Sequence, residues 1–381
     1  MSQKDLTTQE ENDEAASSTR TVTEAIDALR DRSSSRRHFL AQAGLAGLGV
    51  LAAGQAGASA FPFRSTFPIP AGLPVGRGNG QGGGQGGGQN GGSDNFANVS
   101  DIDVLNFALN LEYLEAEFYV RAAYGTTLGS SDISGRGNDN RAATPGAVIG
   151  FSATPTQDKV PFANTTQDQI IRQYAQEIAT DELTHVRLLR GALGSSAVAR
   201  PTLDIGPAFT AAARAAGVVG PTGTFNPYAD PVSFLLGAFI FEDVGVTAYR
   251  GALSLLSDRG RISVAGGLLG VEAYHASEVR TVLFGIARST NNVGIIDAVQ
   301  KISNLRDAAD GAGDSDQGIT NNDTDQSAVV GTGVSGEANI VPTDANGLVY
   351  ARTLRQVLSI VYLGGTASGG FLPNGLNGRV R

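Results

Sequence analysis

Two short phrases with the same residue types and spacing could do chemistry. Glu182 lies three positions before His185, and Glu272 lies three positions before His275. Residues i and i+3 of a helix lie on one face, so each phrase can direct a carboxylate and an imidazole at the same point. Carboxylate oxygen and imidazole nitrogen together suit iron or manganese. If both phrases lie on helices, they indicate a metal site.

Two further glutamates lie in stretches that match each other. The segments 108–119 (ALNLEYLEAEFY) and 238–249 (AFIFEDVGVTAY) both place Glu four residues after Ala, and Tyr seven residues after Glu. At helical spacing, Glu112 and Glu242 are each centred on an apolar stripe. The resulting order, Glu, Glu-x-x-His, Glu, Glu-x-x-His, resembles the ligand set of ferritin-like dinuclear carboxylate bundles.

Burial supplies a physical reason for metal at these positions. An isolated buried carboxylate costs on the order of several kcal/mol, and converging carboxylates repel each other unless cations lie between them. Two divalent ions would balance four glutamates. We therefore predict two divalent metal ions, iron or manganese, with the ligands Glu112, Glu182, His185, Glu242, Glu272 and His275. The alternatives are surface acids beside two satisfied histidines, or a site that folds alike but binds metal poorly.

Other polar residues flank the predicted ligands. Tyr119 and Tyr249 project towards the same layer, and are candidate catalytic residues that could bond to ligands or relay electrons; as core tyrosines they need no such role. Asp181 could orient the histidine of the opposite phrase, or it could be exposed. We expect Glu115 and Glu278 to be peripheral.

The composition excludes several classes of function. A chain of 381 residues with 41% hydrophobic content can bury a large core. Its net charge of −9 disfavours nucleic acid and anionic membranes as partners. Cysteine is absent from the sequence, which excludes disulfides, thiolate catalysis and iron–sulfur sites.

The first 98 residues differ in composition from the rest. Arg36-Arg37 with Phe39-Leu40, a Gly/Ala-rich run and Ala58-Ser-Ala60 resemble a twin-arginine export signal over residues 1–60. A basic turn before a buried helix and a membrane anchor are the alternatives. Residues 61–98 are predicted to be a Gly-rich flexible linker. We expect export by the twin-arginine route to the periplasm or another extracytoplasmic space, with only transient membrane contact through the signal region.

Hydrophobic periodicity and end signals predict an all-α fold. The expected bundle spans residues 99–308, with long helices near 100–124, 166–193, 230–256 and 262–288, a long loop over 125–165 and a long crossover over 195–229. A fifth helix is expected near 295–308. Residues 309–381 are predicted to be a C-terminal appendage that packs on the bundle and contains a helix near 346–363. Asp314-Ser-Asp316 is expected to be a solvated turn.

Several phrases outside the ligands carry a family resemblance. They are Phe225-Asn-Pro-Tyr228, Val244-Gly245 with Ala248-Tyr249 and Gly251, Ile302-Ser-Asn-Leu-Arg-Asp307, and the tail GGFLPNGLNG at 369–378. Over residues 100–378, the chain resembles the ferritin-like family that includes the desiccation-related proteins. The resemblance implies a ferritin-like four-helix bundle with extra C-terminal helices, and stress-associated export. By analogy, Glu112 and Glu242 would be terminal ligands, while Glu182 and Glu272 would bridge the metals.

The resemblance does not fix a reaction. We expect an exported dinuclear iron or manganese protein that reacts with dioxygen or peroxide, as a di-metal oxidase, a ferroxidase or a peroxide scavenger. The alternatives are manganese-catalase-like peroxide dismutation, metal binding without turnover, and a structural desiccation or stress protein. The expected partners are a small oxidant or metal ions, and an oligomer is possible.

Overall fold

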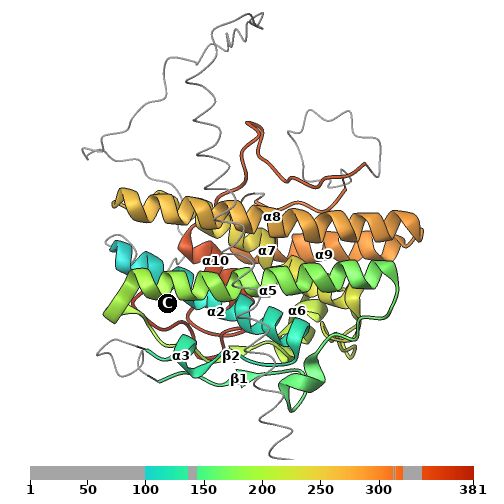
Figure 1. Cartoon of the computed structure of the whole chain (residues 1–381). Coiled ribbons are helices and arrows are strands. Elements are labelled where there is room, and N and C mark those ends of the chain that lie inside the picture. Colours follow the sequence, from blue (N-terminus) through green and yellow to red (C-terminus); the bar gives the residue numbers. More distant parts are fainter. Residues whose placement is uncertain (1–98, 136–143, 312, 314, 321–336) are drawn as a thin grey trace, which may run out of the picture. The chain divides into compact units, whose positions relative to one another are not determined.

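The computed structural model of the chain describes residues 99–135, 144–311, 313, 315–320 and 337–381 (Figure 1). The predicted signal region (residues 1–60) and Gly-rich linker (61–98) lie outside these residues, and both stay predictions.

Four long helices dominate the described part of the chain. They are α2 (Asp101–Tyr124), α5 (Thr166–Leu193), α7 (Pro231–Leu253) and α8 (Arg259–Ser289). The helices form two closely packed pairs, α2 with α5 and α7 with α8. Figure 1 shows the two pairs stacked on each other, with α8 over α5. The predicted all-α four-helix architecture is confirmed.

Local signals in the sequence explain where these helices begin and end. The side chain of Ser100 caps α2 in a reciprocal capping box with Asp103, and Gly125 ends the helix at a φ of 69°. Thr165 caps α5 by accepting from the backbone N–H of Asp168. Asp230 caps α7, which then begins at Pro231.

Helix α7 is the core helix of the bundle. Among the described residues, it is the one helix long and apolar enough to cross a membrane, yet 89% of its apolar window is buried inside the protein. Its apolar side chains therefore pack against the neighbouring helices. A glutamate on this helix has to be accommodated within a protein interior.

The two long connections, from α2 to α5 and from α5 to α7, are tied together. The first contains α3 (Ser130–Ile133), β1 (Val148–Ile149) and the 3₁₀ turn η2 (Pro155–Asp158). The second contains η3 (Gly194–Ser196), β2 (Leu203–Asp204) and α6 (Pro207–Ala215). Strands β1 and β2 pair in parallel, with Val148 opposite Leu203. The sequence did not predict these strands, because two residues are too few to show alternation.

The C-terminal part adds α9 (Val293–Asp310) and α10 (Leu354–Val361), which contact each other and α7. The predicted start of the last helix at residue 346 was wrong. The Asp344 carboxylate accepts hydrogen bonds from the backbone N–H groups of Asn346 and Leu348, and Gly347 has a φ of 72°. This turn prevents a helix there, and α10 begins only after its cap, Thr353.

Three buried arginines join the C-terminal part to the bundle. Arg280, Arg306 and Arg352 pair with the carboxylates of Asp243, Asp310 and Asp316, and we call these six residues the arginine network. The Nε atom of Arg352 lies 2.6 Å from Asp310 Oδ2. The expectation of a solvated turn was wrong for Asp316, which is only 3% exposed, while Asp314 lies outside the described residues.

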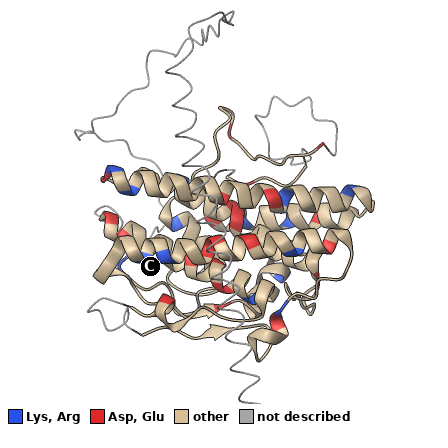
Figure 2. Ribbon diagram, viewed as in Figure 1, with Lys and Arg blue, Asp and Glu red and all other residues tan. Residues whose placement is uncertain are grey.

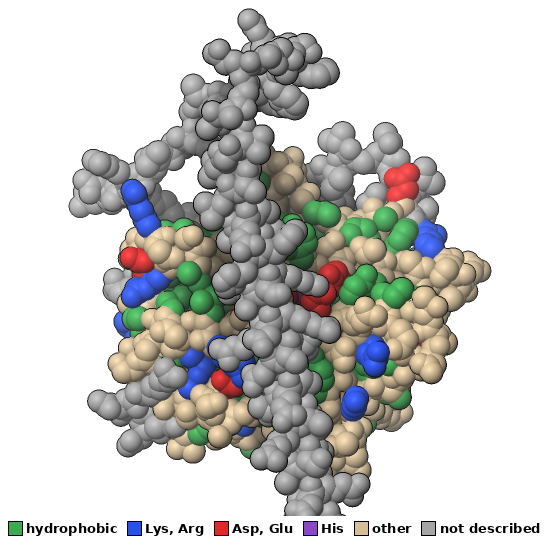
Figure 3. All heavy atoms as spheres, viewed as in Figure 1, with side chains coloured by type: hydrophobic (Ala, Val, Ile, Leu, Met, Phe, Trp, Pro, Cys, Tyr) green, Lys and Arg blue, Asp and Glu red, His purple; other side chains and the backbone are tan. Residues whose placement is uncertain are grey.

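Charged side chains lie both inside the bundle and on its surface. In Figure 2, acidic residues gather near the middle of the long helices, inside the bundle. On the face in Figure 3, the described part shows scattered basic and acidic side chains between small hydrophobic areas. The acidic groups within the bundle are therefore the feature that needs a chemical explanation.

Candidate metal centre

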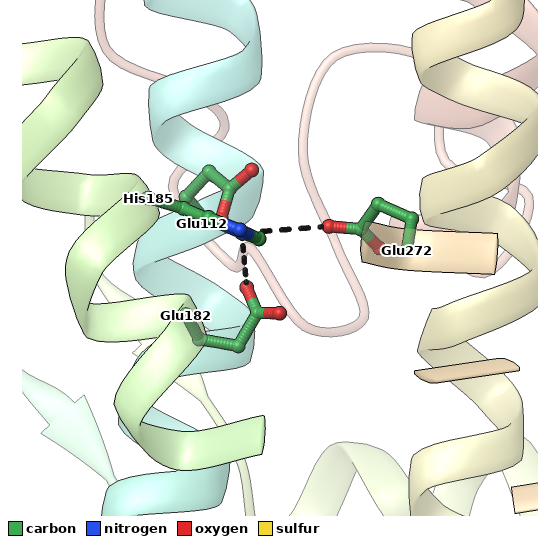
Figure 4. Close-up of side chains that lie close together, drawn as sticks. All are labelled: Glu112, Glu182, His185 and Glu272. Carbon is green, nitrogen blue, oxygen red and sulfur yellow. Dashed lines mark ion pairs between the residues drawn. The ribbon is translucent and has the colours of Figure 1, made fainter. Parts of the chain in front are cut away.

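All four long helices contribute to one buried cluster. Helix α2 carries Glu112, α5 carries Glu182 and His185, α7 carries Glu242, and α8 carries Glu272 and His275. Each of these side chains is buried, and the most exposed, His185, is 5% accessible. The structure brings all six predicted ligands together, and Figure 4 shows four of them converging from helices on both sides.

The six residues divide into two groups, each around one histidine. In the first group, His185 Nδ1 lies 3.2 Å from Glu112 Oε2, 3.5 Å from Glu182 Oε2 and 3.8 Å from Glu272 Oε1 (Figure 4). In the second group, His275 Nδ1 lies 3.1 Å from Glu182 Oε1 and 3.5 Å from Glu242 Oε2.

These separations fit ligands that share an ion. Two ligand atoms that each lie about 2.1 Å from one ion, at right angles, are about 3 Å apart. Within each group, the potential ligand atoms all lie within 4.8 Å of one another. Glu182 offers one oxygen to each group, which is the position of a bridging carboxylate. Glu272 directs Oε1 to the first group, while Oε2 faces the backbone at Gly245.

Eight buried atoms of the cluster have no hydrogen-bond partner among the described residues. They are Glu112 Oε2, Glu182 Oε1 and Oε2, His185 Nδ1, Glu242 Oε2, Glu272 Oε1 and Oε2, and His275 Nδ1. Buried polar atoms are nearly always satisfied, since leaving one unpaired costs about 1–3 kcal/mol. A concentration of such atoms at one point, all of them electron-pair donors in suitable protonation states, is what a cation would satisfy.

Electrostatics in the cluster point the same way. Burial raises the pKa of Glu112 to about 7. Burial, together with the charges of Glu182 and Glu115, raises the pKa of Glu272 well above its usual range. Burial alone would lower the pKa of His185, but Glu112 and Glu182 raise it to about 11. In the protein alone, protons thus supply the positive charge that the carboxylates need, and a bound cation would displace them.

Two tyrosines cross between helices to hold the outer glutamates. Tyr119 on α2 donates a hydrogen bond to Glu242 Oε1 on α7, and Tyr249 on α7 donates to Glu112 Oε1 on α2. The arrangement is reciprocal, as the matching sequences of the two helices suggested. In both cases, the second oxygen, Oε2, is left facing a histidine. Tyr119 and Tyr249 therefore orient the predicted ligands.

Asp181 contacts the histidine of the opposite phrase. Its Oδ2 atom lies 3.4 Å from His275 Nε2, and its side chain is 43% exposed. An acid at this position fixes the ring and its tautomer, leaving Nδ1 for the cluster. The equivalent position before Glu272 is Val271, so the same helical position on α8 offers His185 no acid. The two groups are thus chemically unequal.

Two further acids were expected to be peripheral. Glu115 is 6% exposed and lies beside Glu272 at Gly245, but it belongs to neither of the two groups of potential ligands. Burial and the charges of Glu182 and Glu242 raise its pKa well above the usual range. Its spacing of three residues from Glu112 was the signal that placed it on the same face. Glu278 is only half-buried, although its Oε2 atom has no described hydrogen-bond partner.

Comparison with known proteins supports the architecture. A family model described as Ferritin-like domain matches residues 100–285. A "Ferritin-like catalase Nec2" of Nesocodon mauritianus is 28% identical over 292 residues, which cover 75% of this chain and 86% of that protein. A "Desiccation-related protein PCC13-62" of Craterostigma plantagineum is 29% identical over 266 residues, 68% of this chain and 76% of that protein. No solved structure matches significantly.

The matched region contains α2, α5, α7 and all but the last turn of α8, together with all six residues of the cluster. The alignments with the two relatives cover 292 and 266 residues, so both extend beyond the matched region of 100–285. The chain therefore has an all-α, ferritin-like fold, and its relatives support the family that includes ferritin-like catalases and desiccation-related proteins.

Proposed function

We propose that this protein binds two iron or manganese ions at the six-residue cluster and uses them to react with peroxide or dioxygen. The observation that supports this most is the convergence of eight unpartnered buried atoms from four helices. Four carboxylates and two imidazoles form a donor set of oxygen and nitrogen, which suits these metals better than metals that prefer sulfur. The match to a relative named as a catalase supports a redox role.

The chain's own residues would each have a task. The bound ions would supply the change of oxidation state that the reaction needs. Glu182 would contribute negative charge to both groups, since one of its oxygens faces each of them. Tyr119 and Tyr249 would hold Glu242 and Glu112 in their ligating orientation. Asp181 would keep His275 in the tautomer that leaves Nδ1 free to bind.

Peroxide dismutation is the reaction that we favour. Two molecules of hydrogen peroxide yield two of water and one of dioxygen, so peroxide serves as both oxidant and reductant. The reaction therefore needs no separate electron donor. The first test is metal analysis of the full chain purified without chelators. We expect about two iron or manganese ions per chain, and the ratio should fall in Glu242→Gln, which removes a ligand charge within the same volume.

Glu117→Gln is the matched control, because Glu117 is a buried glutamate on α2 that pairs with Arg200 outside the cluster. It should keep its metal. Less than about a tenth of an ion per folded chain would contradict the metal site. With metal bound, oxygen evolution from peroxide identifies dismutation, whereas consumption of dioxygen during oxidation of added ferrous iron identifies a ferroxidase-type reaction.

A second candidate is a structural stress protein without turnover. The match to a relative named as a desiccation-related protein favours it, because that name specifies a condition rather than a reaction. A folded protein that lacks metal, or that binds metal without reacting with peroxide or dioxygen, would support this candidate.

A further inference from the structure

A small apolar cavity adjoins the candidate metal centre. It has a volume of about 30 Å³ and lies between α2, α7 and α10. Apart from half-buried Leu111, the residues around it are buried. The lining is apolar except for Glu112, Glu115 and Tyr249. The space thus reaches a predicted metal ligand, Glu112.

A second cavity of about 200 Å³ lies between α6, α7, α9 and α10. Its lining includes the exposed residues Ala215, Ala308 and Gly364, so it opens at the surface. The remaining lining is apolar apart from Arg306, whose guanidinium is engaged by Asp243 and Asp316. This outer cavity is therefore a mostly apolar vestibule, in which the charge of Arg306 is balanced by two carboxylates.

The two cavities share one wall. Ile240, Ile360 and Phe371 line both of them. Phe371 also packs edge-on against Phe209 and Phe241, with ring centroids 5.0 and 4.9 Å apart. A single layer of apolar side chains therefore separates the vestibule from the space beside Glu112. Displacement of these side chains would join the two cavities.

The chemistry of the inner cavity selects its occupant. A volume of about 30 Å³ holds roughly two water-sized molecules, and a buried water usually needs about three polar partners. Among the polar atoms of this lining, Glu112 Oε1 accepts from Tyr249, whereas Glu112 Oε2 has no hydrogen-bond partner among the described residues. Along the apolar part of this lining, which includes Phe107, Val244 and Ala252, hydrogen peroxide would leave both of its O–H groups unpaired. A diatomic apolar gas meets no such penalty.

We propose that the two cavities form a dioxygen passage, which joins the surface between α6 and α9 to the candidate metal centre at Glu112. The role of the passage rests on the proposed function, in which dioxygen is released by dismutation or consumed as an oxidant. Peroxide, being polar, would use a different approach. The affinity of the cavities for an apolar gas does not depend on bound metal.

The test uses xenon, an apolar atom of similar size that binds in dry protein cavities. Crystals of the full chain, with and without metal, are pressurised with xenon. We expect xenon in both cavities in both states. Ala252→Leu should fill the inner cavity and abolish the inner xenon peak while the outer peak remains. Ala309→Leu, which narrows the vestibule, is the matched variant and should affect the outer peak first.

A kinetic measurement tests whether the passage is used. In metal-loaded protein, Ala252→Leu should slow oxidation of the reduced centre by dioxygen, and Phe371→Leu, which thins the shared wall, should not.

Ordered water in place of xenon in the inner cavity would overturn the passage. If metal and turnover are present, yet Ala252→Leu leaves the dioxygen dependence unchanged, the passage is wrong and the proposed function stands. Xenon binding in a protein that takes up no metal overturns the proposed function and, with it, the role of dioxygen.

Discussion

At the scale of single residues, the reciprocal tyrosine–glutamate hydrogen bonds set the orientation of the Glu112 and Glu242 carboxylates in the cluster. Each tyrosine donates to one oxygen of a glutamate on the other helix, so that the second oxygen faces a histidine. A carboxylate held in this way has lost rotational freedom before any ion binds. Partners of this kind typically contribute 10–100-fold to metal affinity or activity.

We therefore predict that Tyr119→Phe weakens metal binding by roughly 10–100-fold, because Glu242 Oε1 loses its donor and the side chain becomes free to rotate. Competition with a chromophoric chelator measures the dissociation constant for Mn²⁺. Tyr113→Phe is the control, since Tyr113 is also buried on α2 but donates to the carbonyl of Val198. Equal affinities in the two variants would show that Tyr119 is only a core residue.

The residues of the cluster were predictable because helical spacing alone brings them to the apolar face of each helix. Glu112, Glu182, Glu242 and Glu272 all satisfy that rule. The hydrogen bond from Tyr119 to Glu242 was not predictable. The two residues are 123 positions apart, and their contact depends on how α2 and α7 dock. The predicted roles of these residues as metal ligands stay predictions until metal is measured.

At the scale of helices, the closeness of α7 and α8 depends on one glycine. A Cβ atom at Gly245 would lie 2.1 Å from Glu272 Oε2 and 2.9 Å from its carboxyl carbon. Real Cβ atoms do not approach other atoms so closely, so the carboxylate occupies space that any side chain at this position would need. The absence of a side chain on α7 thus creates the room for a carboxylate from α8.

Gly245→Ala is predicted to displace Glu272 and reduce metal binding, even though alanine favours a helix by up to about 1 kcal/mol over glycine. Gly267→Ala on α8 is the matched control, because nothing lies within 4 Å of its Cβ position and it should be neutral or stabilising. Metal content and thermal unfolding are measured in parallel. Full metal content in Gly245→Ala would show that Glu272 can bind from another rotamer.

The four long helices were predicted to within a few residues because periodicity and caps agree, as at Ser100 and Asp230. The start of α10 was predicted eight residues too early, because the apolar pattern runs through a turn that Asp344 and Gly347 impose. Local hydrogen bonds of Asp can override a helical pattern, and their outcome depends on geometry that the pattern does not contain.

At the scale of the whole molecule, the arginine network holds the C-terminal part against the bundle. Asp316 accepts from both Arg306 and Arg352, which come from α9 and from the segment before α10. Burial would raise the pKa of Asp316, but Arg306 and Arg352 lower it. Asp316 therefore stabilises the fold above its unfolded pKa, and this contribution is lost as the pH falls towards its lowered folded pKa.

Arg352→Ala is predicted to destabilise the protein by about 3–5 kcal/mol, because Asp310 and Asp316 would remain buried without their shared partner. Urea unfolding measures the change in free energy. Arg379→Ala should change it by less than about 1 kcal/mol, since the Arg379–Asp103 pair is exposed. Similar losses in both variants would contradict a special role for the network.

The sequence predicted that residues near 302–307 belong to a recognisable phrase, but it did not predict the network. Arg306 and Asp243 are 63 positions apart, and Arg352 and Asp316 are 36 apart. Charged residues in a polar, Asp-rich stretch are usually solvated, so burial of Asp316 could be read only from the folded chain.

The pairing of the helices has a consequence for folding. Each group of ligands includes residues from both helix pairs. In the second group, for example, Glu182 from the α2–α5 pair lies beside Glu242 and His275 from the α7–α8 pair. A single helix pair therefore offers an incomplete set. An ion that binds only the complete set adds its binding free energy to the docked state alone, by mass action. The concentration of free metal ion would then help to set the stability of the state in which the two helix pairs are docked.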